Sequence, residues 1–259
     1  MAIRHLHDRS EVVAETWTVP TADGGMGVHV RRPEGDGPFP VVVFFHHGPG
    51  LDDGSREAMN RIAAAGHLVV APDRYHREGS WITFDTAELL SGGPDSEPMR
   101  RCLALITGTT DDMVETDLRA LLDRLGDEPS ARHEPMGCVG YCVGARSVVR
   151  SMAGHPDVLT AGAMLHPSFC VEPEPGSPHL AVPQLSGELY VAIGGADHMA
   201  SAEANRPLIE AVAELGERGL VEIHDGADHG FAVPGPSYHE AAGERSYQRV
   251  LSLFARALV

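Results

Sequence analysis

The chain has 259 residues and a formal net charge of −17, and 42% of its residues are hydrophobic. This length can bury a large core, and we predict one α/β domain over residues 1–259. The negative charge argues against nucleic acid and anionic membrane surfaces as partners, because both would repel the protein.

The basic residues and cysteines exclude further classes of chemistry. All 20 cationic side chains are arginine, so lysine Schiff bases, P-loop lysines and Ser-Lys dyads are excluded. No stretch reaches the length of a transmembrane span, and residues 1–8 lack the apolar core of a signal peptide. The four cysteines show no C-x-x-C spacing, so we expect neither a disulfide framework nor a clustered metal motif. These features predict a cytoplasmic protein.

Apolar runs and helical periodicities alternate along the chain. Strands are predicted at 12–19, 27–32, 41–45, 68–71, 161–165, 189–193 and 221–223, with a hairpin turn at Gly24-Gly25. Helices are predicted at 55–65, 111–125, 202–215 and 240–258, and Ser55 is the expected first cap. A strand, turn and helix follow one another over 136–153. Residues 78–110 are interpreted as an excursion over the strand ends, and 171–183 as a Pro-rich loop. The alternation predicts a doubly wound, mostly parallel sheet with helices on both faces.

The turn over residues 140–144 reads Gly-Tyr-Cys-Val-Gly and carries the strongest functional signal. It is a G-x-C-x-G form of the strand-turn-helix elbow that exposes a nucleophile at a sheet edge. The glycines suit a strained turn in which strand and helix backbones pass close together. Cys142 would sit at a helix N-terminus, which lowers a thiol pKa. A small buried Cys in a Gly-rich turn is the alternative.

Two later loops supply an acid and a base in the order nucleophile, acid, base. Asp197 follows the predicted strand 189–193, and His229 lies in the turn-rich loop after 221–223. Asp225 and Asp228 are rival acids beside His229, although turn formation explains them. A Cys-His-Asp set would let His229 activate the Cys142 thiol while Asp197 fixes the imidazole tautomer.

These motifs resemble the dienelactone hydrolase family of the α/β-hydrolases. The resemblance rests on G-Y-C-V-G at 140–144, P-D-R-Y-H-R at 72–77, the Gly-rich loop ending at Asp197 and H-G-F at 229–231. It implies Cys142 as nucleophile, Asp197 as acid and His229 as base. It also implies an oxyanion hole from the backbone N–H groups of Gly48 and Val143.

The chain departs from the family pattern at two positions. The family has an acidic residue where this chain has His47, and a second substrate-binding arginine where it has Val233. The resemblance implies that Arg77 alone would bind a substrate carboxylate. A surface salt bridge is the alternative role of Arg77. His47 becomes a candidate substrate or leaving-group contact, with an exposed loop histidine as the alternative.

Two aromatic residues are further candidates for the substrate site. Tyr141 stands beside the nucleophile, where packing is the alternative role, and Trp81 lies in the excursion after the second central strand.

The resulting hypothesis is a hydrolase of a small ester or lactone, with or without a carboxylate, that forms a thioester acyl-enzyme and needs no cofactor or metal. Two readings stay open beside it. One is a thioesterase or natural-product esterase of the same fold. The other is a non-hydrolytic isomerase, lyase or binding protein using the same cleft. The sequence does not specify the substrate or the oligomeric state.

Overall fold

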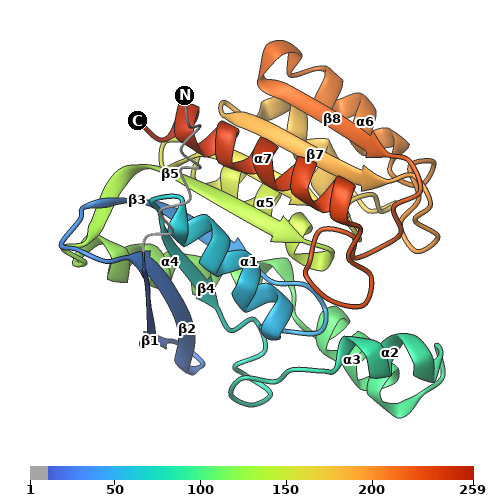
Figure 1. The fold of residues 1–259 in the computed structure, drawn as a ribbon, viewed down its shortest axis with the longest axis horizontal. Coiled ribbons are helices and arrows are strands. Elements are labelled where there is room, and N and C mark those ends of the chain that lie inside the picture. Colours follow the sequence, from blue (N-terminus) through green and yellow to red (C-terminus); the bar gives the residue numbers. More distant parts are fainter. Residues whose placement is uncertain (1–10) are drawn as a thin grey trace, which may run out of the picture.

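The computed structural model describes residues 11–259, so the N-terminal segment 1–8 discussed above lies outside the described residues. Eight strands form one sheet in the order β1-β2-β4-β3-β5-β6-β7-β8 (Figure 1). The strands are β1 (Val12–Thr21), β2 (Gly24–Pro33), β3 (Phe39–Phe45), β4 (Leu68–Pro72), β5 (Ala131–Tyr141), β6 (Leu159–Leu165), β7 (Glu188–Gly194) and β8 (Gly219–His224).

The strand directions confirm the predicted α/β class. Strands β3 to β8 run parallel to one another. Only the entry hairpin is antiparallel, with β2 also pairing antiparallel to β4. The residues of β3 from Val41 to Phe45 are apolar and buried, as expected for a strand covered on both faces.

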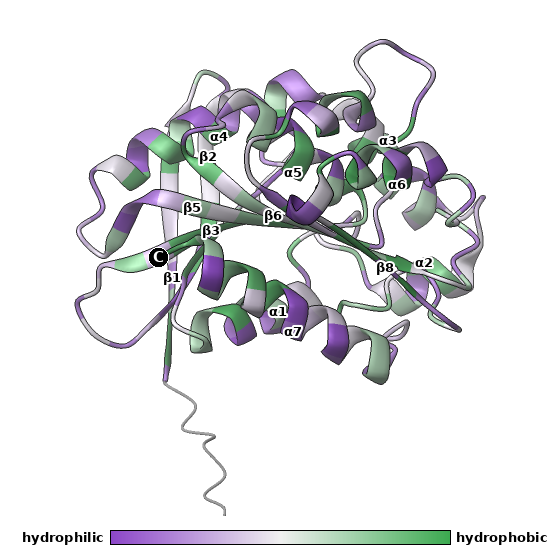
Figure 2. Ribbon diagram, turned by 90° about the horizontal axis from the view of Figure 1, so that it is seen from above, coloured by the Kyte–Doolittle hydropathy of each residue, from purple (hydrophilic) through white to green (hydrophobic). Residues whose placement is uncertain are grey.

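Helices cover both faces of the sheet (Figure 2). Those bordering the sheet are α1 (Asp53–Ala64), α4 (Asp111–Gly126), α5 (Val143–Gly154), α6 (Arg206–Ala213) and α7 (Glu240–Ala257). Helices α4, α5 and α6 contribute to one hydrophobic cluster, while α1 and α7 contribute to the other. The two-sided packing agrees with a doubly wound sheet.

The segment predicted as an excursion contains two helices, α2 (Thr86–Gly92) and α3 (Glu97–Gly108). They pack against each other apart from the two helical layers (Figure 1). Leu89 of α2 and Cys102 and Ile106 of α3 are buried with Val143, at the start of α5. This helix pair, called the lid below, therefore covers the edge of the sheet where β5 ends.

Three local predictions need correction. The hairpin turn lies at residues 22–23 and not at Gly24-Gly25, because both glycines already pair with β1. The first helix is capped by Asp52, whose side chain accepts a hydrogen bond from the backbone N–H of Ser55, so Ser55 lies inside the first turn. The helix predicted at 202–215 begins only at Arg206, because Pro207 suits the first turn of a helix and not its interior.

Among the helices of residues 11–259, none is both long and apolar enough to cross a membrane.

Candidate active site

The elbow places Cys142 in a strained backbone conformation directly between β5 and α5. Its φ and ψ are 53° and −120°, which is unfavourable for a residue with a side chain. A Cβ on Gly140 would collide with the carbonyl of Gly144, and one on Gly144 would collide with the carbonyl of Phe45. Both flanking glycines are therefore required by the close backbone passage at this turn.

The predicted acid and base meet after β7 and β8. The Nδ1 atom of His229 is 2.8 Å from Oδ2 of Asp197. The other oxygen of Asp197 accepts hydrogen bonds from the backbone N–H groups of Met199 at 2.9 Å and Ala200 at 2.7 Å. Asp228 instead accepts from the backbone N–H of His229. Asp197 thus has the geometry to hold the imidazole.

The thiol and the imidazole shift each other's pKa. Burial raises the pKa of Cys142, but the nearby charge of His229 opposes it, with help from Ser168 and His47, and the net pKa is about 7. Within residues 11–259, Nε2 of His229 has no hydrogen-bond partner. Burial would lower the pKa of His229, but the Cys142 thiolate and Asp197 raise it to about 10. The arrangement therefore favours a thiolate and an imidazolium at neutral pH.

Backbone donors are available beside the thiol. Val143 is the first residue of α5, where an N–H has no partner within the helix. Gly48 lines the same cavity as Cys142, and its carbonyl accepts a hydrogen bond of 2.9 Å from the hydroxyl of buried Tyr75. That bond orients the peptide between Gly48 and Pro49. An oxyanion hole formed by the N–H groups of Gly48 and Val143 stays a prediction.

His47 lies in the cavity with a carboxylate behind it. Its Nε2 atom is 3.1 Å from Oδ1 of Asp52, and both side chains are largely buried. Burial raises the pKa of Asp52, but His47 and the N–H of Ser55 lower it to about 2, so Asp52 is ionised. A second imidazole-carboxylate pair thus faces the thiol where the family pattern has an acid. The neighbouring His46 is directed away, with Nδ1 2.7 Å from the carbonyl of His47.

Two cavity residues were missed by the sequence analysis. His166 is buried with φ of 40°, its ring is 4.9 Å from that of His229, and both ring nitrogens lack hydrogen-bond partners within residues 11–259. The hydroxyl of Ser168 is 3.7 Å from Sγ of Cys142. Their position in the sequence was the available signal, because His166 directly follows β6, which lies between β5, the strand before Cys142, and β7, the strand before Asp197.

Arg77 is engaged elsewhere. Its two terminal nitrogens pair with both oxygens of Asp117 at 2.7 and 2.8 Å, and Nε is 2.7 Å from Asp23. It is absent from the lining of the cavity at Cys142. The structure therefore does not bring Arg77 to Cys142, because α4 supplies a buried carboxylate that satisfies its guanidinium.

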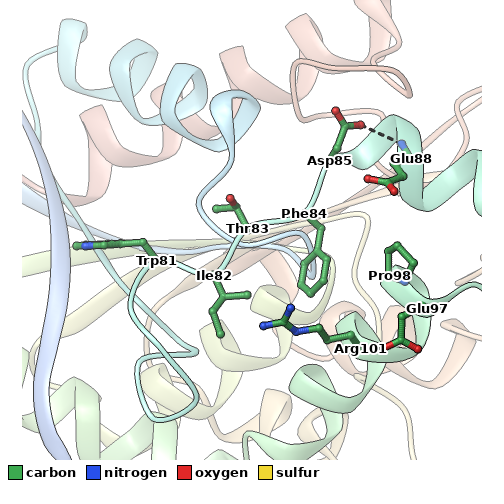
Figure 3. A pocket seen from close by; sticks show the side chains of 9 residues that line it. All are labelled: Trp81, Ile82, Thr83, Phe84, Asp85, Glu88, Glu97, Pro98 and Arg101. Carbon is green, nitrogen blue, oxygen red and sulfur yellow. Dashed lines mark hydrogen bonds between the residues drawn. The ribbon is translucent and has the colours of Figure 1, made fainter.

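The two aromatic candidates also lie away from this cavity. Trp81 borders a separate cavity of about 480 Å³, where its ring is directed away from Arg101 (Figure 3). The ring packs on that of His29 with centroids 4.1 Å apart. Tyr141 is buried and stacks on Phe44 at 5.0 Å. Both side chains pack against other rings, and neither lines the cavity at Cys142, where the sequence predicted substrate contacts.

Within the described residues 11–259, no three His, Cys, Asp or Glu side chains are grouped so that they could hold a metal ion.

Comparison with known proteins agrees with this fold. Residues 26–258 match the model of the dienelactone hydrolase family. The chain belongs to this family. A putative carboxymethylenebutenolidase of Escherichia coli K12 is 27% identical over 94% of this chain and 87% of its own. The hydrolase PyvD of Aspergillus violaceofuscus is 27% identical over 94% and 92%.

A solved structure extends the likeness to the fold. The putative dienelactone hydrolase of Klebsiella pneumoniae superposes with a TM-score of 0.79 at 22% identity, covering 95% of this chain and 99% of its own. The family match and the curated relatives together identify the chain as a dienelactone hydrolase-like hydrolase.

Proposed function

We propose that the protein hydrolyses a small ester or lactone through a Cys142-His229-Asp197 triad and a thioester acyl-enzyme. The observation that carries the proposal is the imidazole of His229, held 2.8 Å from a buried carboxylate and coupled on its other side to the strained Cys142 thiol. Nucleophile, base and orienting acid each come from a different strand end, as triad chemistry requires.

In the first half-reaction, the Cys142 thiolate attacks the carbonyl carbon and a C–S bond forms. The carbonyl oxygen takes the electron pair and is stabilised by the N–H groups of Gly48 and Val143. The tetrahedral intermediate collapses, the C–O bond to the leaving alcohol breaks, and His229 gives that oxygen its proton. The acyl group stays on Sγ as a thioester.

In the second half-reaction, neutral His229 takes a proton from water as the water oxygen attacks the thioester carbonyl. The same backbone N–H groups hold the second oxyanion. The C–S bond then breaks, the acid leaves and the thiolate-imidazolium pair is restored. Asp197 keeps the imidazole oriented through both halves by holding Nδ1, and remains ionised because His229 and two backbone N–H groups lower its pKa despite burial.

The proposed partner is a small-molecule ester or lactone, with or without a carboxylate, and not a macromolecule. The charge of −17 disfavours nucleic acid and anionic membranes as partners. All four cysteines are free thiols, which supports a reducing, cytoplasmic location.

The test is turnover of p-nitrophenyl acetate by wild type, Cys142→Ala and Cys102→Ala. Cys102 is a second thiol lining the same cavity, which makes it a matched control. We expect loss of turnover, by about 10³-fold or more, in Cys142→Ala only. For Asp197→Asn, the intact mass should increase by one acyl group, and peptide mapping should place that group on the peptide that contains Cys142. Neither burst nor turnover in wild type would favour a non-hydrolytic protein and refute the proposal.

A further inference from the structure

The cavity at Cys142 has largely apolar walls, and its one cationic group among the described residues is the His229 imidazolium, which is paired with Asp197. Its volume is about 340 Å³, within the range of small-molecule sites. Within residues 11–259, no arginine is among its lining residues, and the chain has no lysine. The one lining acid, Glu172, is paired with Arg146. Leu89, Met99 and Ile106 of the lid supply much of the wall facing the thiol.

The rim of this cavity exposes large hydrophobic side chains. Leu90 and Leu103 of the lid are 52% and 39% exposed, Phe169 after β6 is 41% exposed, and Met199 after β7 is 66% exposed. All four line the cavity that contains Cys142. Single exposed hydrophobic residues need no explanation, but a group around one opening marks a surface that binds an apolar partner.

The charges around the thiol oppose an anionic substrate. Asp52 and Asp197 both have lowered pKa values and stay ionised at neutral pH. The positive charge of His229 is shared between Asp197 and the Cys142 thiolate. A substrate carboxylate in this cavity would lose its hydration and meet no cation in return, which is costly.

Neither of the two positions at which the family pattern has an arginine supplies a cation to this cavity. Arg77 is fixed by Asp117 and Asp23, at a distance from the cavity. Val233 stands where the family pattern has its second arginine, and it is buried in the cluster under α1 and α7. Nothing in the described part of the chain therefore compensates a carboxylate beside the nucleophile.

We propose that the cavity selects esters of neutral, apolar acyl groups of several carbons and rejects carboxylate-bearing acyl groups. The inference rests on the proposed Cys142 hydrolase. During turnover the acyl group remains bonded to Sγ, so it occupies the cavity that contains Sγ. Its chain extends along Leu89 and Met99 of the lid toward the rim.

The first experiment compares kcat/KM for p-nitrophenyl acetate, butyrate and hexanoate with that for mono-p-nitrophenyl succinate. Complete burial of each added methylene would raise kcat/KM about fourfold, and partial burial gives a smaller gain. We expect hexanoate to exceed acetate by about tenfold or more. The succinate ester, which has the same carbon number as the butyrate ester, should be at least about tenfold poorer than butyrate.

The second experiment tests whether the rim residues cause the preference for longer acyl chains. Leu90→Gln and Leu103→Gln should lower the hexanoate-to-acetate ratio by about twofold to fourfold. Ile223→Gln is the matched control, because Ile223 is 50% exposed on β8 and does not line the cavity. Its ratio should equal that of wild type. Met199→Arg should raise the succinate-to-butyrate ratio by supplying the missing cation.

The outcomes separate the two proposals. A flat or falling acyl-chain series, or a preference for the succinate ester, with turnover still dependent on Cys142, would overturn the apolar inference and leave the hydrolase intact. An unchanged ratio in both lid variants would also contradict it. Absence of turnover on every ester would refute the hydrolase and the substrate class together.

Discussion

The sharpest test of the site is the selective alkylation of Cys142 in the free enzyme. The pKa of its thiol is about 7, whereas burial raises the pKa of Cys102 to about 11. Burial alone raises the pKa of Cys138, and it dominates the rise for Cys170. At pH 7, about half of Cys142 and about one part in 10⁴ of Cys102 would be thiolate, because the pKa values differ by about 4.

This ratio of thiolates overstates the difference in rate. A thiolate of lower pKa is intrinsically less nucleophilic, with a Brønsted coefficient of about 0.4–0.5, which removes roughly 10^1.6 to 10² over four pKa units. The net expectation is that Cys142 reacts about a hundredfold faster than Cys102. Partial exposure of Cys142 beside the buried Cys102 widens the gap.

The assay is a short iodoacetamide pulse at several pH values, followed by peptide mapping by mass spectrometry. The Cys142 rate should rise with pH and reach half its maximum near pH 7. In His229→Gln the midpoint should move up toward the ordinary thiol value, because His229 is the main group that lowers the pKa of Cys142. Labelling of Cys102 as fast as Cys142, or a midpoint above about pH 9 in wild type, would refute the reasoning.

Three further perturbations have expected outcomes. His47→Glu places a carboxylate beside the thiol, so the alkylation midpoint of Cys142 should rise; an equal or lower midpoint would show that His47 does not act on it. Arg77→Ala should lower thermal stability by about 4–8 °C, corresponding to roughly 2 kcal/mol, because buried Asp117 loses its bidentate partner. The same variant should affect kcat/KM for acidic and neutral esters equally, and a selective loss on acidic esters would return Arg77 to the substrate site. Dialysis against EDTA should leave esterase activity unchanged, and a loss restored by zinc would contradict a metal-free mechanism.

The sequence predicts the elbow and the acid-base pair because both depend on local order. Two glycines around Cys142 are required by the turn itself. Asp197 lies in the loop after a buried strand, whereas Asp225 and Asp228 share the turn of His229. Asp197 was therefore the best-placed carboxylate to bond Nδ1 of His229, as the structure shows. Strand order then brings these groups to one edge without further information.

Arg77 and Trp81 were not predictable in the same way, because distant parts of the chain determine their positions. The guanidinium is oriented by Asp117, forty residues later on α4. The indole lies over Gly27, where a Cβ would collide with it. A motif records which residue follows a strand, but not which tertiary partner engages its side chain.

The sequence of the lid contains signals for helix α3, but its Gly, Ser and Pro content favoured an irregular segment. Residues 78–98 are rich in Gly, Ser and Pro, which suggested an irregular excursion. Yet Ser96 caps α3, and the spacing of Cys102, Leu105 and Ile106 gives this short helix a buried stripe. The stripe packs on the start of α5 and not on the sheet, so an isolated helix prediction would not have revealed its role.

One carboxylate links the lid to the nucleophile. Oδ1 of Asp52 is 3.1 Å from the imidazole of His47, and Oδ2 accepts a hydrogen bond of 3.2 Å from the hydroxyl of Thr86, in the first turn of α2. One carboxylate oxygen of Asp52 thus contacts α2, and the other contacts the imidazole of His47. An acyl chain packed under the lid would contact α2. Asp52 connects α2 to His47, which lowers the pKa of Cys142. The apolar wall and the reactivity of the thiol are therefore physically connected, and replacement of the family's acid by a histidine that pairs with Asp52 is what connects them.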